Sequence, residues 1–103
     1  MKRAKFSIGQ CIQHCMYDYR GVIVDADPEF IGTDEWYEQV ATSRPPKDEP
    51  WYHVLVHDGG RETYVAERNL VLDDSNEPVD HPLVHEFLNE FEHGHYQSNR
   101  YIN

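Results

Sequence analysis

Positive charge is scarce in this chain. Nine Lys and Arg stand against nineteen Asp and Glu, which gives a formal net charge of −10 at pH 7. Because phosphate binding depends on Lys and Arg, this balance disfavours a nucleic-acid-binding surface spread over the whole molecule. The candidate DNA-binding residues are the few cations that folding would have to gather into one patch: Lys2, Arg3, Lys5, Arg20 and Arg61.

Long apolar runs are also missing. The first ten residues, MKRAKFSIGQ, are basic but contain no apolar stretch of the length found in secretion signals, and later aliphatic runs are as short as Val54–Val56. A membrane-spanning helix needs roughly 20 apolar residues. We therefore expect a cytoplasmic protein without a membrane span.

Cysteine is limited to Cys11 and Cys15. Both lie in a stretch that alternates like a β-strand, where four residues cover about 13 Å. That separation exceeds the roughly 7 Å limit between the Cα atoms of a disulfide. We expect neither a disulfide nor a shared zinc ion, and we interpret the two thiols as small buried or half-buried side chains.

The sequence lacks the usual catalytic motifs. It has no Gly-rich phosphate loop and no GxSxG. His81 and His85 have the spacing of two metal ligands on a helix, but no third ligand is evident and the stretch HEFLN lacks the second histidine of HExxH. His14 is best explained as a core histidine that hydrogen-bonds to the backbone. We predict no catalytic, cofactor-binding or metal-binding residues, and no enzymatic activity.

Alternating polar and apolar residues predict a mainly β fold of about five antiparallel strands. The residues Asp58, Gly59 and Gly60 predict a hairpin turn that allows positive φ, and residues 66–70 predict a short 3₁₀ turn. The predicted strands cover residues 10–17, 22–24, 51–57, 63–65 and 71–72.

A long loop is expected between the second and third strands, over residues 28–50. Within it, Glu35–Val40 predicts one or two helical turns, with Trp36 and Tyr37 as candidate partner-binding residues. Other aromatic residues gather around the predicted hairpins, and core packing explains most of them. Aromatics without interleaved Lys or Arg suit a protein-binding groove better than a single-strand nucleic-acid platform.

The C-terminal part predicts a polar linker followed by a helix from His81 to Glu92. Pro82 suits the first turn of such a helix, and Gly94 suits its end. Apolar residues recur at helical spacing and form one stripe: Leu83, Val84, Phe87, Leu88 and Phe91. This stripe is expected to dock on the chain's own sheet, on a second copy or on a partner, so Leu83, Phe87 and Phe91 complete the candidate partner-binding set.

Several ordered strings carry a family resemblance: FSIGQ at 6–10, His14, YRGVI at 19–23, Asp27 with Pro28, PWYHVLV at 50–56 and YVAERNL at 64–70. Over residues 6–72 the chain resembles the YccV-like family. Its bacterial members include the heat-shock protein HspQ, described as a hemimethylated-DNA-binding protein. The resemblance implies a small SH3-like β-barrel.

The same resemblance implies two roles. One is to promote ATP-dependent proteolysis of selected, denatured proteins during heat stress, and the other is to bind hemimethylated DNA near the replication origin. The acidic composition favours the first, with a protease and its substrates as partners, and leaves duplex DNA as the alternative. We predict one domain over residues 1–103, with the barrel in 6–72 and a linker and helix in 73–95; a homo-oligomer is compatible with the sequence.

Overall fold

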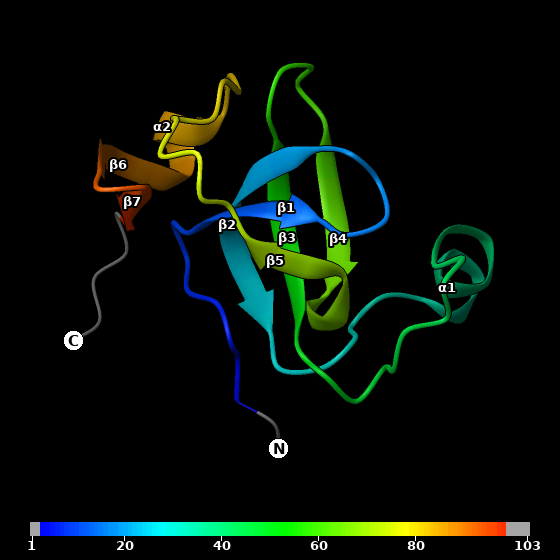
Figure 1. The fold of residues 1–103 in the computed structure, drawn as a ribbon. Helices are drawn as coiled ribbons and strands as arrows, with labels where there is room; N and C mark the ends of the chain where they lie inside the picture. Colours follow the sequence, from blue (N-terminus) through cyan, green and yellow to red (C-terminus); the bar gives the residue numbers. More distant parts are fainter. Residues whose placement is uncertain (1–2, 99–103) are drawn as a thin grey trace.

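The computed structural model describes residues 3–98 of the chain. In this part the protein is mainly β, with a five-stranded antiparallel sheet, a separate two-stranded hairpin, two short α-helices and one 3₁₀ turn (Figure 1). The elements are β1 (Cys11–His14), β2 (Arg20–Asp27), α1 (Asp34–Val40), β3 (Trp51–Val56), β4 (Glu62–Ala66), η1 (Glu67–Asn69), β5 (Leu70–Leu72), α2 (Val84–Phe87), β6 (Leu88–Glu92) and β7 (His95–Ser98). None of the helices in residues 3–98 is long and apolar enough to cross a membrane.

The main sheet has the strand order β4-β3-β2-β1-β5. A shift in the pairing of β2 with β3, between Ile23 and Asp25, marks a bulge of the kind that bends and twists a strand. Within the described residues no hydrogen-bonded ladder joins β4 to β5, so the sheet is not a closed barrel. The short β5 pairs with β1 alone.

The first strand is shorter than predicted because His14 turns the chain. The His14 Nδ1 atom accepts hydrogen bonds from the backbone N–H groups of Met16 and Tyr17, at 3.0 and 3.1 Å. This confirms that His14 bonds to the backbone. Both cysteines are free, but only Cys11 is buried; the expectation was wrong for Cys15, which lies beyond the strand and is exposed.

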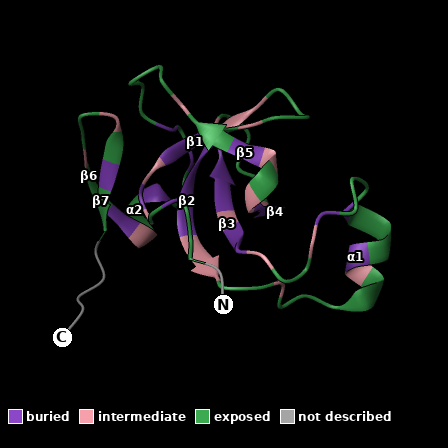
Figure 2. Ribbon diagram, turned by 60° about the horizontal axis from the view of Figure 1, so that its bottom comes forward, coloured by how far each residue is buried: buried purple, intermediate pink, exposed green. Residues whose placement is uncertain are grey.

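The sheet is buried on both faces, which explains the unbroken run Val22–Val24. Val22 and Val24 pack on one face with Leu55, while Ile23 packs on the other with Tyr52. Figure 2 shows the buried residues concentrated in the central strands, with α1 largely exposed.

The predicted helical turns between β2 and β3 are present as α1. The Thr33 hydroxyl accepts a hydrogen bond from the Trp36 N–H at 3.1 Å and caps the helix, and acidic residues occupy its first turn. Tyr37 is the buried residue of this helix, and its hydroxyl donates to the Pro45 carbonyl at 2.7 Å. The segment that follows is therefore tied back to the helix.

The prediction of a helix from His81 to Glu92 is wrong for most of that range. The helix is limited to Val84–Phe87, and residues from Leu88 onward form the β6–β7 hairpin. Its turn has positive φ at His93 and Gly94, which is the geometry of a tight two-residue hairpin turn rather than a helix end. A pairing shift between Leu88 and Phe91 places both side chains toward the core, so the strand reproduces the three-residue spacing of a helix.

The hairpin and α2 cover the face of the sheet that carries Val22 and Val24. The Tyr96 N–H donates to the Gly9 carbonyl at 2.8 Å, and the Gly9 N–H donates to the Ile23 carbonyl at 2.8 Å. The N-terminal segment at Gly9 therefore joins the hairpin to β2. The apolar stripe docks on the chain's own sheet, which is one of the three predicted alternatives; the others were a second copy and a partner.

Candidate aromatic binding site

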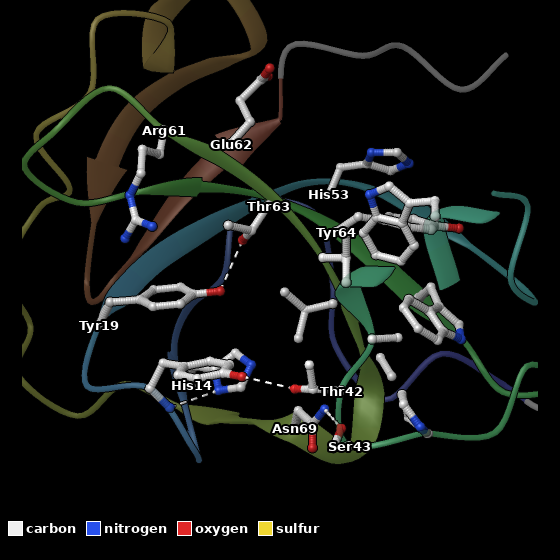
Figure 3. A pocket seen from close by; sticks show the side chains of 18 residues that line it. His14, Tyr19, Thr42, Ser43, His53, Arg61, Glu62, Thr63, Tyr64 and Asn69 are labelled. Atoms are coloured by element: carbon white, nitrogen blue, oxygen red, sulfur yellow. Dashed lines mark hydrogen bonds between the residues drawn. The ribbon is translucent and has the colours of Figure 1, made fainter. Parts of the chain in front are cut away.

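An open groove of about 650 Å³ lies between the β1–β2 turn, α1 with the residues after it, and strand β4. Figure 3 shows His14 and Tyr19 on one side of it and Tyr64 on the other, with Thr63 between them. Rings from different parts of the sequence thus meet around one space. We call it the aromatic groove.

The first wall is a turn cluster of His14, Tyr17 and Tyr19. The His14 ring lies 4.8 Å from the Tyr17 ring and 5.2 Å from the Tyr19 ring, measured between centroids. Tyr17 is 52% exposed, whereas His14 and Tyr19 are partly buried. Burial lowers the pKa of His14, which favours a neutral ring at neutral pH.

The second wall is a strand cluster of Trp36, Trp51, His53 and Tyr64. The Tyr64 ring lies 5.7 Å from Trp36, 5.2 Å from Trp51 and 4.5 Å from His53. Trp51 is buried at the base, while the other three rings are partly exposed. Alternation along β3 and β4 places Trp51, His53 and Tyr64 on one side of the sheet, and α1 supplies Trp36.

Polar atoms of several of these rings are already hydrogen-bonded within the protein. The hydroxyls of Tyr17 and Tyr19 pair with those of Thr42 and Thr63, at 3.1 and 2.9 Å. The Tyr64 hydroxyl donates to Asp27 Oδ2 at 2.7 Å, and the Trp51 indole N–H donates to the Pro46 carbonyl at 3.1 Å.

These bonds orient the rings. Burial, together with the bond to Asp27, raises the pKa of Tyr64, and burial raises the pKa of Tyr19, so both hydroxyls stay protonated at neutral pH. The Tyr64 hydroxyl also accepts from the Ile31 N–H at 3.1 Å, which fixes the segment leading to α1. What the groove offers to a ligand is mainly ring surface.

Charged side chains are few in the groove. Among the described residues that line it, one is a Lys or Arg, namely Arg61, and one carries a carboxylate, namely Glu62. The Arg61 guanidinium lies over the Tyr19 ring, 5.8 Å from its centroid. The arrangement has the character of an aromatic recognition surface and not of a phosphate cradle.

A family model described as hemimethylated DNA-binding protein YccV-like matches residues 4–95. The chain belongs to the YccV-like family. The match includes every side chain of the two ring clusters and extends into the C-terminal hairpin. The resemblance found over residues 6–72 therefore continues through the linker and β6 of this YccV-like protein.

The candidate partner-binding residues fall into two groups. Trp36 lines the aromatic groove, whereas the Tyr37 ring is buried beside it. Phe87 and Phe91 pack partly buried against the core under the hairpin, and Leu83 is 38% exposed. The structure thus separates Trp36 from the C-terminal set.

The candidate DNA-binding residues are not gathered into one patch by the structure. Lys2 lies outside the described residues. Arg20 donates to Asp73 Oδ2 at 2.8 and 3.1 Å and is held between β2 and the segment after β5. Arg61 precedes β4 at the β3–β4 turn, and Figure 1 shows that turn at the opposite end of the sheet from the N-terminal segment with Arg3 and Lys5.

The two histidines considered for metal binding, His81 and His85, lie in different environments. His81 is 6% exposed; its Nδ1 atom accepts from the Leu83 N–H at 3.0 Å and its Nε2 atom lies 3.1 Å from the Arg61 carbonyl. Both ring nitrogens of His81 are therefore engaged, whereas His85 is exposed. Within residues 3–98 no group of three or more His, Cys, Asp and Glu side chains is placed to hold a metal ion.

Sequence reasoning missed the groove as a site. It noticed that aromatic residues gather around the hairpins but assigned most of them to core packing, and Trp51 does belong to the core. The signal that points to a surface is the placement of Tyr17 and Tyr19 in a turn, where the chain is exposed.

Proposed function

We propose that this chain is a non-catalytic, cytoplasmic binding protein that promotes ATP-dependent proteolysis of denatured proteins, and that the aromatic groove contacts its protein partners. The observation that carries the proposal is the groove itself, an open space of about 650 Å³ lined by rings from four separate segments. Exposed aromatic side chains are typical of sites where proteins bind other proteins.

The charge distribution supports a protein partner. Seven of the nine Lys and Arg lie within residues 3–98, and four of these have a carboxylate oxygen within 4.0 Å. Cations that are already paired contribute little to phosphate binding. The acidic molecule is better suited to contacts made by ring surfaces.

A reconstituted degradation assay tests this proposal. A purified ATP-dependent protease is given a heat-denatured client, with and without the chain, and the rate of client loss is measured. We expect the wild-type chain to raise the rate and Trp36→Leu, which removes an exposed ring of the groove, to abolish most of that gain. Ile31→Ala is the matched control, because Ile31 is 66% exposed but does not line the groove. An equal gain with Trp36→Leu and wild type would exclude the groove as the contact.

Hemimethylated DNA remains the second candidate function. It is supported by the match to a family described as hemimethylated DNA-binding. For this chain, such binding would depend on the cations that are not paired to carboxylates, such as Arg61 at the rim of the groove. A titration with hemimethylated and fully methylated duplexes separates this role from the first.

We also propose that the fold is SH3-like. The strongly paired β2–β3–β4 meander, the 3₁₀ turn η1 and the short β5 that returns to β1 support this description. In this description residues 28–50 are the long loop that carries α1 to the side of the sheet.

A further inference from the structure

Resting on the proposed function, we infer that the aromatic groove selects positively charged segments of its protein partners, by holding a Lys or Arg side chain against the ring faces of the turn cluster and the strand cluster. The occupant is an extended, basic peptide segment of a client. The inference deepens the proposed function by naming what the groove recognises.

The first argument is the surface that the groove presents. The hydroxyls of Tyr17, Tyr19 and Tyr64 are all committed to bonds inside the protein, so the ring faces are what remains for a ligand. The face of an aromatic ring carries negative electrostatic potential, and a cation within about 6 Å of its centroid is attracted to it. A groove lined by two clusters of such rings therefore favours a cation over a neutral group.

The second argument is charge complementarity. The chain carries a net charge of −10, so the field around it attracts cationic segments and repels anionic ones. Glu62 is the carboxylate among the described lining residues and can pair with a bound ammonium or guanidinium. The net negative charge of the chain would repel a nucleic acid or an acidic peptide.

The third argument is that cations already lie on rings in and beside this site. The Arg61 guanidinium lies 5.8 Å from the Tyr19 centroid, and Lys47 Nζ lies 4.4 Å from the Tyr37 centroid next to the strand cluster. Arg61 shows that the turn cluster accepts a guanidinium at the mouth of the groove. A partner's side chain would bind on the other ring faces that line the groove.

Matched peptides test the inference. The probes are short capped peptides with one central Arg or Lys, compared with the same peptides carrying citrulline or norleucine, which keep the size but lack the charge. Binding to isotopically labelled protein is followed by the shift of the backbone N–H signal of Thr63, which lines the groove and is kept in every variant, and in the wild type also by the shift of the Trp36 indole N–H signal. We expect the charged peptides to bind about tenfold more tightly than the neutral ones, and added salt to reduce the difference.

Variants place the binding in the groove. Trp36→Leu removes one ring of the strand cluster, and Tyr17→Leu removes an exposed ring of the turn cluster and serves if the first variant is poorly folded. Each is expected to remove most of the preference for the charged peptide, whereas Ile31→Ala leaves it unchanged.

The outcomes separate this inference from the function on which it rests. Equal binding of charged and neutral peptides in the groove overturns the charge selection and leaves the protein-binding role intact. Absence of peptide binding, with degradation still dependent on Trp36, also overturns it. If neither peptide binding nor degradation depends on the groove, both proposals fail, and a duplex that shifts the Trp36 signal more than the peptides do would reassign the groove to DNA.

Discussion

Among the glycines, Gly9 has the least room for a side chain. It has φ of +96°, and a Cβ atom added there would overlap the carbonyl oxygen of Tyr96. We predict that Gly9→Ala lowers the free energy of unfolding by about 2 to 4 kcal/mol, because a strained backbone and a steric overlap add to each other. Urea denaturation measures the loss.

Gly60→Ala is the matched control for this prediction. Gly60 also has positive φ, of +72°, but a Cβ atom there would meet nothing within 4 Å. We expect it to cost about 1 kcal/mol, from backbone strain alone. Equal losses for the two variants would show that the contact between Gly9 and Tyr96 does not constrain the fold.

Asp73 makes stability depend on acid pH. Burial by itself would raise the pKa of this carboxyl, but hydrogen bonds from Arg20, Ser75 and Gln13 outweigh burial and lower the pKa to about 2. A pKa below the unfolded value of about 4 gives stability that is complete above pH 4 and is lost as the pH falls through about 2.

We therefore predict that Asp73→Asn lowers the free energy of unfolding by about 2 to 3 kcal/mol at neutral pH, because the partly buried Arg20 loses its partner. The difference from wild type should shrink between pH 4 and pH 2, as followed by urea denaturation at each pH. Asp34→Asn is the control, since the Asp34 side chain is 87% exposed in its pair with Lys47. A difference that stays constant down to pH 2 would contradict the assigned pKa.

At the scale of elements, the packing of the β6–β7 hairpin on the main sheet can be tested by mutation. Leu88 is 1% exposed in the core between the hairpin and the sheet, whereas Leu83 is 38% exposed. We predict that Leu88→Ala destabilises the fold by about 2 to 5 kcal/mol and that Leu83→Ala costs much less. Thermal melts with light scattering measure both; equal effects, or a change of mass with Leu88→Ala, would contradict docking within one chain.

The type of an element could be predicted where its residue pattern fits a strand or a helix but not both. The run Trp51–Val56 and the Asp58–Gly60 turn predicted the central hairpin, and the i, i+4 spacing of Trp36 and Val40 predicted α1. The C-terminal helix failed because a bulged strand and a helix both place Leu88 and Phe91 on one face. Only tertiary pairing, the bond from Tyr96 to Gly9, decides between them.

At the scale of the whole molecule, the net charge of −10 limits how strongly DNA can bind. If three phosphates are contacted, affinity should fall roughly 40-fold between about 50 and 200 mM salt. We predict weak, steeply salt-dependent binding to a hemimethylated duplex, measured by fluorescence anisotropy, and a further loss when Lys2, Arg3 and Lys5 are neutralised together. Nanomolar binding at physiological salt that discriminates against fully methylated DNA would reverse our order of the two functions.

The aromatic groove was less predictable than the fold because it exists only in three dimensions. Tyr17 and Tyr64 lie far apart in the sequence, and each is unremarkable in its own strand or turn. Their placement around one groove depends on the bend of the sheet and on where the residues after α1 return, held by bonds such as that between the Tyr17 and Thr42 hydroxyls. Spacing along a chain carries no such information.

The bond between Tyr96 and Gly9 has a consequence for how the protein is made. Strand β7 leaves the ribosome after the whole main sheet has been synthesised, yet it covers the face that carries Val22 and Val24. Until then, that face of the nascent chain is open to chaperones and proteases. The last strand of residues 3–98 thus covers the sheet by pairing with a segment made much earlier.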